Sequence, residues 1–410
     1  MLSPMLPTNS NVDDETTTKV YSNYEVADIF RRYGEEYRSR NRITKKQHKV
    51  ISAIADCRTS KCGYHIDMCV GCGYTENEYN SCHDRHCPKC QGISRHKWVD
   101  ARLADILPVS YYHVVFTLPH LLHPLVSYNK ALLYDLLFKS AAETLLVFGR
   151  DPKWLGGDIG FYGVLHTWGQ TLWPHPHVHF IVPGGALTKD NRWVEPKYKS
   201  KFLFPVHALS KVFRGKFIEG LKNTCWSGDL MFPEDSKHLD HEDQFERWID
   251  KLVARNWVVY CKRPFDDAEH VVGYVGRYTH RVAISSHRII DVGNGMVQFW
   301  YKDYKASRKV RRKMTLTAQE FIRRFLWHVL PSGFHKIRHF GFLSNGHCKA
   351  KIAKIREILG TKRPDSEDTA WSGVCCPACK KGKLRPFLIF NGFGHIIASF
   401  FKTGYAFDTS

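Results

Sequence analysis

The segment from residue 57 to residue 97 limits most strongly how this chain can fold, because cysteines and histidines stand there in place of aliphatic runs. Such a segment cannot bury enough apolar surface to fold unaided, so it predicts a small module held together by metal. It contains two Cys-x-x-Cys pairs, Cys69/Cys72 and Cys87/Cys90. Each pair can bring two thiolates to one tetrahedral zinc ion, and two such loops together complete the coordination shell.

A second, interleaved zinc site is predicted from the remaining ligands of the segment. Its proposed members are Cys57, His65, Cys82 and His86. Cys62 and His83 leave the composition of this second set open. Structural zinc does no chemistry, so the module is expected to recognise DNA or a partner, with Arg85 and Lys89 suited to phosphate contacts.

The composition favours a polyanionic partner. The 410 residues include 60 Lys and Arg against 40 Asp and Glu, which gives a formal net charge of +20. No apolar run is long enough to span a bilayer, and the N-terminus lacks the pattern of a secretory signal. We therefore expect a cytoplasmic protein without a membrane partner, whose 13 cysteines are metal ligands rather than disulfides.

Periodicity and turn residues predict a mixture of helices and strands after a polar tail at residues 1–18. Residues 268–283 are ambiguous, because their helical spacing is weakened by two glycines. The remaining predictions are helices within 24–56 and at 131–148 and 241–260, strands at 111–118, 160–169 and 177–182, and a hairpin at 288–302.

A histidine-rich strand follows Trp173, with the sequence Pro-His-Pro-His-Val-His-Phe-Ile-Val-Pro-Gly-Gly. Side chains alternate along a strand, so His177 and His179 point to the same side and form half of a metal site. His175 offers an alternative pairing with His177, although Pro176 between them disfavours regular strand geometry. Histidines that bind no metal are the competing interpretation.

Two tyrosines, Tyr274 and Tyr278, are four residues apart and would share one face of a helix. Aromatic residues at this spacing usually belong to a core. Here Gly, Thr and His surround them, and Arg277 and Arg281 repeat the same spacing. This pattern favours an exposed pair of hydroxyl groups that faces phosphate.

The C-terminal part is basic between residues 301 and 340, with aromatic residues interleaved. Basic groups can follow a nucleic-acid backbone while aromatic rings stack on unpaired bases, although a solvated face is the simpler alternative. The predicted DNA contacts are Arg308, Lys309, Arg311, Arg312 and Lys313. Further on, Cys375, Cys376 and Cys379 could form half of another zinc site, which His347 and Cys348 could complete.

Several ordered blocks resemble the rolling-circle transposases of the insertion sequence ninety-one type, which carry a His-hydrophobe-His (HUH) motif and two tyrosines. The blocks that carry the resemblance are residues 57–91, 111–119, 174–185, 257–287, 301–304 and 337–343. The resemblance implies an α+β protein: a helical, zinc-binding DNA-recognition domain at 19–100, and an HUH-endonuclease domain at 105–345 with a central antiparallel sheet flanked by helices. A C-terminal extension would occupy 346–410.

The resemblance also implies a mechanism. His177 and His179 would hold Mg²⁺ or Mn²⁺ against a phosphate of single-stranded DNA at a transposon end or target site. Tyr274 or Tyr278 would attack the phosphorus and form a 5′-phosphotyrosine. The third metal ligand stays open among five candidates, which are His166, Gln170, Glu269, His270 and His280.

Two other readings of the chain remain. It could be a replication initiator or relaxase, or a non-catalytic, zinc-dependent DNA-binding regulator derived from a transposase, which would not need the intact histidine and tyrosine set. The sequence contains no Walker A loop, so a helicase would have to come from the host. Oligomeric state and the recognised DNA sequence are not readable from the chain.

Overall fold

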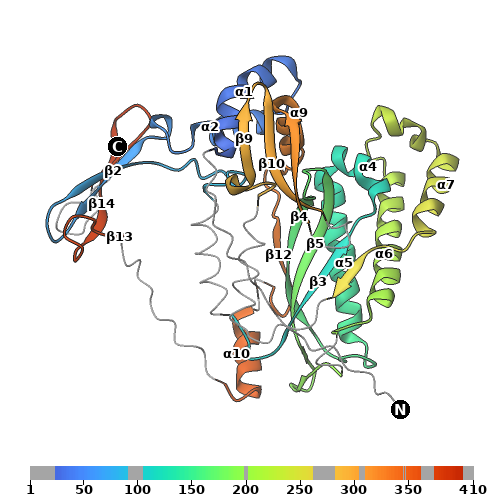
Figure 1. Cartoon of the computed structure of the whole chain (residues 1–410). Helices are drawn as coiled ribbons and strands as arrows, with labels where there is room; N and C mark the ends of the chain where they lie inside the picture. The colour runs from blue at the N-terminus through green and yellow to red at the C-terminus, as the bar shows by residue number, and fades with distance from the viewer. Residues whose placement is uncertain are drawn as a thin grey trace, which may run out of the picture.

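The computed structural model describes residues 24–90, 105–197, 202–261, 282–303, 310–344, 346, 348–361 and 374–399. Helices surround a central antiparallel sheet in the order β12-β4-β5-β3-β8 (Figure 1), which confirms the predicted α+β class. Its strands are β3 (Tyr111–Thr117), β4 (Gly160–Trp168), β5 (Pro174–Pro183), β8 (Val259–Cys261) and β12 (Ile337–Gly341). The strand β5 begins before the predicted one and includes Pro176.

One face of this sheet is apolar and lies under helices. Val178 and Phe180 of β5 point there and are fully buried, together with Val114 and Phe116 of β3. Gly163 fits under Phe180, because a Cβ at this position would lie 2.5 Å from Phe180 Cε1. The covering helices are η2 (His120–Leu122), α4 (His123–Tyr128), α5 (Lys130–Arg150), α6 (Val206–Trp226), η3 (Glu234–Asp240) and α7 (Glu242–Val253).

The helices on this face match the sequence in part. The predicted helix at 131–148 is confirmed as α5, whereas α6 was not predicted, although Leu209, Phe213, Phe217 and Leu221 repeat at helical spacing. The prediction of one helix over 241–260 is wrong beyond Val253. There the chain turns so that Trp257 packs its ring against two phenylalanines of α6. In the described part of the chain, no helix has the length and apolarity needed to cross a membrane.

The opposite face of the sheet is divided along its length. At one end α10 (Cys348–Ile358) covers it, and Ile352 and Ile355 pack with Tyr111, Tyr162 and Ile181. At the other end the sheet carries histidines in place of apolar residues. A two-stranded ribbon, β6 (Ala186–Leu187) with β7 (Trp193–Val194), follows β5.

A second core joins the first helices to the middle of the chain. The predicted helical region is confirmed as α1 (Val26–Arg40) and α2 (Lys45–Asp56), and α2 starts at a capping box between Thr44 and Gln47. These helices pack with η4 (Ser286–Arg288), α9 (Ala318–Trp327) and the sheet of β9 (Ile289–Gly293), β10 (Met296–Asp303) and β11 (Val310–Thr317). The predicted hairpin at 288–302 is confirmed as β9–β10.

The C-terminal strands return to the N-terminal module (Figure 1). The strand β14 (Lys383–Phe390) pairs with β1 (Tyr64–Cys69) in an antiparallel sheet. The other members are β2 (Thr75–Tyr79), β13 (Val374–Cys375) and β15 (Ile396–Ser399), and η1 (Ser60–Cys62) precedes β1. The predicted C-terminal extension at 346–410 therefore shares a sheet with the N-terminal module, which the prediction did not include.

His328 connects the two cores as a buried, neutral imidazole. Its Nε2 lies 3.0 Å from the carbonyl oxygen of Leu172 and its Nδ1 lies 3.1 Å from Oγ1 of Thr167. A carbonyl can only accept, so Nε2 carries the proton and Nδ1 accepts from the hydroxyl group. Burial lowers the pKa of His328 to about 3, and the nearby Lys130 and His86 act in the same direction.

We expect His328→Gln to make the protein less sensitive to acid. Between pH 6.5 and about 3 the unfolded chain binds a proton at His328 that the native chain does not. The contribution of His328 to the free energy of unfolding is therefore complete above pH 6.5. It falls as the pH is lowered, by at most about 1.4 kcal/mol per pH unit. Urea unfolding at pH 7 and pH 5 measures the difference. His48→Gln, on the exposed side of α2, is the control, and identical pH dependence of His328→Gln and the parent would contradict the assignment.

Candidate active site and zinc sites

Three histidines converge on the open end of the sheet. Residue His166 of β4 lies directly opposite His177 of β5, and His179 follows on the same side. The ring centroids lie 5.5 Å apart for His166 and His177, 4.5 Å for His166 and His179, and 4.7 Å for His177 and His179. One nitrogen of each ring lies within 4.8 Å of the others. The predicted pair is thus brought together with a third imidazole.

Five residues are the predicted candidates for the third ligand. Glu269, His270 and His280 lie outside the described residues. Gln170 instead binds the edge of the second sheet, where its Oε1 accepts from the backbone N–H of Lys302 at 3.3 Å. Among the described candidates, only His166 points its side chain at the pair.

The ring of His177 is held in the form that binds metals. Its Nδ1 lies 2.6 Å from the carbonyl oxygen of His175, so Nδ1–H donates and the lone pair sits on Nε2. Burial is the main cause that lowers the pKa of His177 to about 3, and the neighbouring His175 and His113 contribute to this shift. The imidazole is therefore neutral at physiological pH.

A fourth histidine supports the cluster from the next strand. His113 of β3 lies parallel to His179, with ring centroids 5.0 Å apart and an interplanar angle of 4°. Its Nε2 lies 2.8 Å from Nδ1 of His179. If His113 accepts this bond, the lone pair of His179 is placed on Nε2, the usual arrangement behind a metal-bound histidine. The sequence offered only one signal for this residue, its position in the strand predicted at 111–118.

The donor set fits a divalent cation. Three buried or half-buried imidazoles from two paired strands present their nitrogens to one point, and backbone and side-chain partners orient two of the rings. A cation held there would be an electrophile for a phosphate oxygen. Chemically, this end of the sheet can therefore bind and polarise a phosphate ester.

Two tryptophans form an aromatic platform at the start of β5. Trp173, immediately before β5, is half-exposed, and its ring centroid lies 5.3 Å from that of Trp327 on α9. The guanidinium carbon of Arg323 lies 4.1 Å from the ring of Trp327, and that of Arg324 lies 4.6 Å from the ring of Trp173. Rings and cations in this arrangement can stack on unpaired bases.

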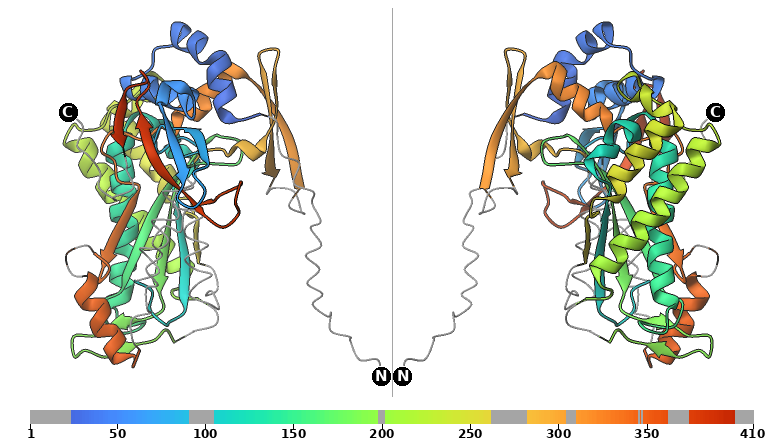
Figure 2. Two further views of the ribbon diagram at one scale, coloured as in Figure 1. Left: turned by 90° about the vertical axis from the view of Figure 1, so that its left-hand side faces the viewer. Right: turned by 90° about the vertical axis from the view of Figure 1, so that its right-hand side faces the viewer.

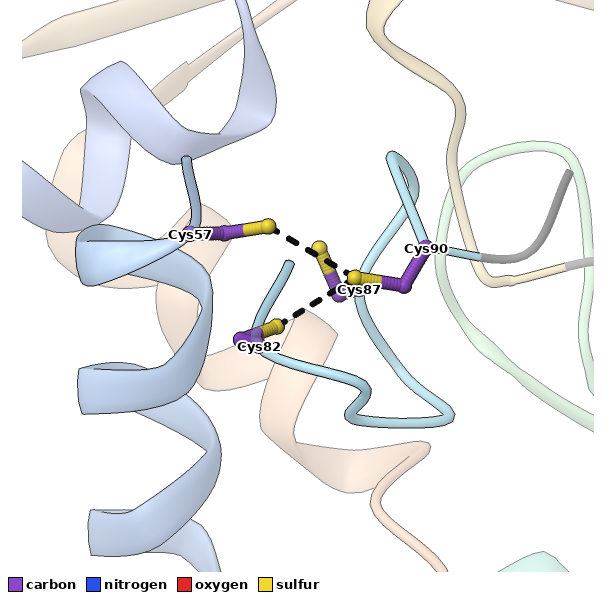
Figure 3. Close-up of side chains that lie close together, drawn as sticks. All are labelled: Cys57, Cys82, Cys87 and Cys90. Carbon is purple, nitrogen blue, oxygen red and sulfur yellow. Dashed lines mark hydrogen bonds between the residues drawn. The ribbon is translucent and has the colours of Figure 1, made fainter. Parts of the chain in front are cut away.

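The first cysteine cluster joins Cys57, Cys82, Cys87 and Cys90 (Figure 3). The Sγ atoms of Cys57 and Cys82 each lie 3.5 Å from Sγ of Cys90. Tetrahedral zinc with bonds of about 2.3 Å places its sulfur ligands about 3.8 Å apart, so the four thiols fit such an ion. Cys57 comes from the C-terminal end of α2 and the others from one loop.

The predicted grouping of ligands was therefore wrong. Cys87/Cys90 does not share a site with Cys69/Cys72, which lie at the β1–β2 turn beside Cys376 and Cys379. The two histidines are also outside the cysteine clusters: Nδ1 of His65 lies 2.8 Å from Oδ1 of Asn80, and Nδ1 of His86 lies 2.9 Å from Oδ1 of Asp84. The fold pairs these histidines with oxygen acceptors and brings remote thiols to the zinc positions instead.

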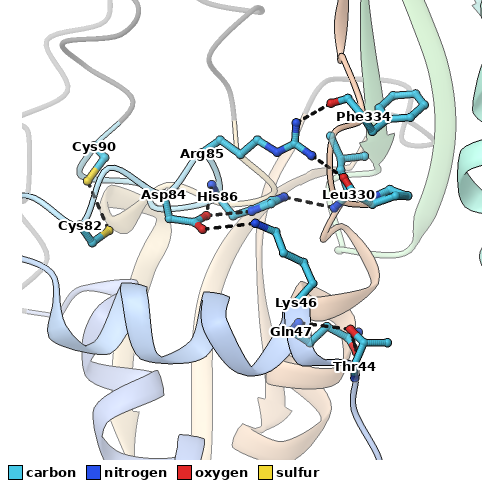
Figure 4. Close-up of polar contacts among 11 residues, drawn as sticks. Thr44, Lys46, Gln47, Cys82, Asp84, Arg85, His86, Cys90, Leu330 and Phe334 are labelled. Carbon is cyan, nitrogen blue, oxygen red and sulfur yellow. Dashed lines mark hydrogen bonds and ion pairs between the residues drawn. The ribbon is translucent and has the colours of Figure 1, made fainter.

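The loop from Cys82 to Cys90 braces the zinc module against the central sheet (Figure 4). Arg85 donates to the carbonyl oxygens of Phe334 and Pro331, at 2.5 and 2.9 Å, in the connection from α9 to β12. Nε2 of His86 accepts from the backbone N–H of Leu330 at 3.2 Å. Lys89 pairs with Glu25 at 2.5 Å. Arg85 and Lys89 thus serve internal contacts rather than the phosphate contacts predicted for them.

The predicted basic strand is present as β11, which stands out from the body in a hairpin with β10 (Figure 2). Arg311, Arg312 and Lys313 are exposed on it. The guanidinium carbon of Arg311 lies 4.5 Å from the ring of Trp300 on β10, and Nζ of Lys313 lies 5.3 Å from the same ring. Arg308 and Lys309 lie outside the described residues.

The predicted nucleophiles, Tyr274 and Tyr278, lie outside the described residues, as do Arg277 and Arg281. The chain enters their segment from β8, which pairs with β3 at the edge of the histidine sheet. It leaves at Val282 and Ala283, which line a cavity together with Thr167 and Trp168 of β4. Both described ends of the segment therefore lie against strands of the candidate site.

Comparison with known proteins agrees with this architecture. A family model described as "Putative transposase" matches residues 160–351, and a "Transposase zinc-binding domain" model matches residues 29–118. "Putative transposase y4qJ" of Sinorhizobium fredii is 44% identical over 384 residues, 90% of this chain and 96% of that protein. The transposase for insertion sequence element IS801 of Pseudomonas savastanoi pv. phaseolicola is 30% identical over 319 residues, 77% of this chain and 75% of that protein.

Among solved structures, the metal-free complex of the conjugative relaxase TrwC with oriT DNA is similar at 12% identity and a TM-score of 0.22, over 62% of this chain and 73% of that one. This structural similarity is low, and the fold assignment rests on the strand pairing described above. The zinc-binding family model spans the first cysteine cluster, which is a structural zinc site.

We expect His166→Ala to weaken Mn²⁺ binding at the sheet at least tenfold, because it removes one of three converging nitrogens. Titration of the purified protein, followed by electron paramagnetic resonance of free Mn²⁺, measures the affinity. His48→Ala, an exposed histidine on α2, should bind Mn²⁺ like the parent. An unchanged affinity of His166→Ala would exclude this residue as a ligand.

We expect His113→Phe to weaken Mn²⁺ binding by about tenfold, because the variant keeps an aromatic ring at this position but removes the nitrogen that bonds to Nδ1 of His179. The same titration measures the effect. His113→Gln, which keeps a polar acceptor, should recover part of the affinity. If His113→Phe binds Mn²⁺ as tightly as the parent, His113 packs beside His179 but does not position it for metal binding.

Proposed function

Since the chain belongs to the insertion sequence ninety-one type of transposases, we propose that it nicks and rejoins single-stranded DNA at transposon ends through a covalent tyrosine intermediate. The observation that carries the proposal is the cluster of His166, His177 and His179 at one end of the central sheet. Three converging imidazoles suit a cation that contacts phosphate, and a protein that only binds DNA does not need them.

The proposed reaction is a transesterification by Tyr274 or Tyr278. The phenolic oxygen forms a bond to the scissile phosphorus, the bond from phosphorus to the 3′ oxygen breaks, and the phenol's proton passes to that leaving oxygen through solvent. The products are a 5′-phosphotyrosine and a free 3′-hydroxyl. A second 3′-hydroxyl reverses the step without ATP, because the phosphotyrosine keeps the energy of the phosphodiester.

The protein's part in this step is to hold the phosphate and the tyrosine together. Mg²⁺ or Mn²⁺ bound by the histidines would supply polarisation of a phosphoryl oxygen and stabilise the charge that develops on it. His113 and the carbonyl oxygen of His175 keep two of the ligand rings in place. With two tyrosines, one can cleave a second strand while the other remains esterified, as strand transfer requires.

The DNA path is supported by two surfaces of described residues. Trp173 and Trp327 offer rings for unpaired bases at the start of β5, and each aromatic stack contributes about 1–3 kcal/mol. The exposed cations of β11 can contact the phosphate backbone on the projecting hairpin. The net charge of +20 favours the same partner.

We expect the purified protein, mixed with Mn²⁺ and a single-stranded oligonucleotide from a transposon end, to form an adduct that survives denaturing electrophoresis. The double variant Tyr274→Phe/Tyr278→Phe should bind the oligonucleotide with parental affinity but form no adduct, because phenylalanine has no nucleophilic oxygen. Tyr260→Phe, an exposed tyrosine of β8, is the matched control and should form adduct normally.

Two outcomes would contradict the proposal. An adduct that persists in the double variant would place the nucleophile elsewhere. A parent protein that binds the end DNA tightly yet never forms an adduct would instead support a non-catalytic regulator.

A further inference from the structure

Two cysteine loops from opposite ends of the chain meet at the edge of the N-terminal module. The loop after β1 carries Cys69 and Cys72, and the loop before β14 carries Cys376 and Cys379. Sγ of Cys69 lies 3.8 Å from Sγ of Cys379, and Sγ of Cys72 lies 3.7 Å from Sγ of Cys376. All four sulfur atoms lie within 4.8 Å of one another.

From this geometry we propose a second structural zinc ion, bound by Cys69, Cys72, Cys376 and Cys379, that clasps the C-terminal strands to the N-terminal module. The sulfur separations match the edge of a tetrahedron around zinc, about 3.8 Å. A disulfide would need two sulfurs at about 2.0 Å, and all four of these cysteines are free. Four free thiols within 4.8 Å of one another favour a metal.

The two loops have the same backbone conformation, as expected of two halves of one site. In each loop the residue four positions after the first cysteine donates its N–H to that cysteine's carbonyl: Gly73 to Cys69 at 3.0 Å, and Lys380 to Cys376 at 2.9 Å. Both donors adopt the left-handed conformation, with φ of 76° for Gly73 and 55° for Lys380. A non-glycine residue accepts this conformation at a cost, which indicates a constraint on the loop.

Backbone amides also point at the sulfur atoms. The N–H of Gly71 donates to Sγ of Cys69 at 3.4 Å, and the N–H of Gly382 donates to Sγ of Cys379 at 3.2 Å. Such donors stabilise the thiolate form, which is the form that binds zinc. Each loop thus supplies one ligand that is prepared for the metal.

Gly382 shows how closely the loops approach. A Cβ on Gly382 would lie 2.4 Å from Sγ of Cys69 and 3.3 Å from Sγ of Cys379. A Cβ on Gly71, in the other loop, would meet its nearest atoms at 3.6 and 3.9 Å, which is ordinary contact. The backbone of one loop therefore packs directly on the ligands of the other.

The apolar contacts at this junction are too few to hold it. Among the residues that the structure describes, the local core consists of Cys69, Cys376 and Leu384 as buried residues, with Cys379 against them. A core of this size cannot offset the entropy of ordering the strands, so the binding energy of a metal is needed. The clasp makes the sheet of β1 and β2 depend on a strand that lies more than 300 residues later in the chain.

The test is a comparison of the metal content of full-length variants. Cys376→Ser/Cys379→Ser should contain one zinc ion fewer per chain than the parent. After exchange for Co²⁺ it should show about half of the thiolate-to-metal charge-transfer absorption, which the histidine site does not produce. Cys348→Ser/Cys375→Ser removes two cysteines outside both clusters and is the matched control. Hydrogen exchange should show lost protection in β14 with protection in β5 retained.

A double variant with the parent's zinc content and absorption would overturn the proposal, as would a parent chain that holds a disulfide among these four cysteines. If the double variant fails to fold, Gly382→Ala tests the zinc site instead, because this variant keeps all four thiols. It should lose one zinc ion to a chelator about tenfold faster than Gly71→Ala does. Equal rates for the two alanine variants would exclude the site.

Discussion

The register between β4 and β5 is the constraint on which the active site depends. It places His166 opposite His177 and, through the pleat, puts His179 on the same side. A slip of β5 by one residue would send His177 and His179 under the helices, away from His166, and bring Val178 and Phe180 out. The apolar face prevents that slip, since Phe180 packs against Phe116 and Phe161 at ring-centroid distances of 5.8 and 5.2 Å. The core thus fixes the ligands without contacting a metal.

The zinc module depends on the same sheet through one loop. Arg85 and His86 bind backbone groups between α9 and β12, and β12 pairs with β4. The first cysteine cluster holds both ends of this loop against the end of α2. Metal, loop and sheet edge therefore form one chain of contacts. Through it, the ion supports the position of the strand that carries His166, although it lies outside the reaction.

Local patterns in the sequence predicted much of this fold, and contacts between remote segments account for what was missed. Alternation identified the strands of His113, His166 and His177, since each has one apolar face. Spacing identified the Cys-x-x-Cys pairs, because two thiols on one loop are a local feature. It could not tell which loops share an ion, and the partner of Cys69/Cys72 lies at the other end of the chain. Histidines of the same segment were predicted as the remaining zinc ligands. Instead, His65 forms a hydrogen bond with Asn80 and His86 forms one with Asp84.

The same reasoning explains why the helix predicted through residue 260 ended early and why His113 was missed. Trp257 leaves the helical path because the core under α6 accommodates its ring, and its Nε1–H finds the carbonyl oxygen of Leu252 at 3.1 Å. His113 gains its role only because β3 pairs with β5 and brings it beside His179. Neither contact can be predicted from the residues that are its neighbours in the sequence. In this protein the local sequence determines which side chains can act, and the order of strands in the sheet determines which of them meet.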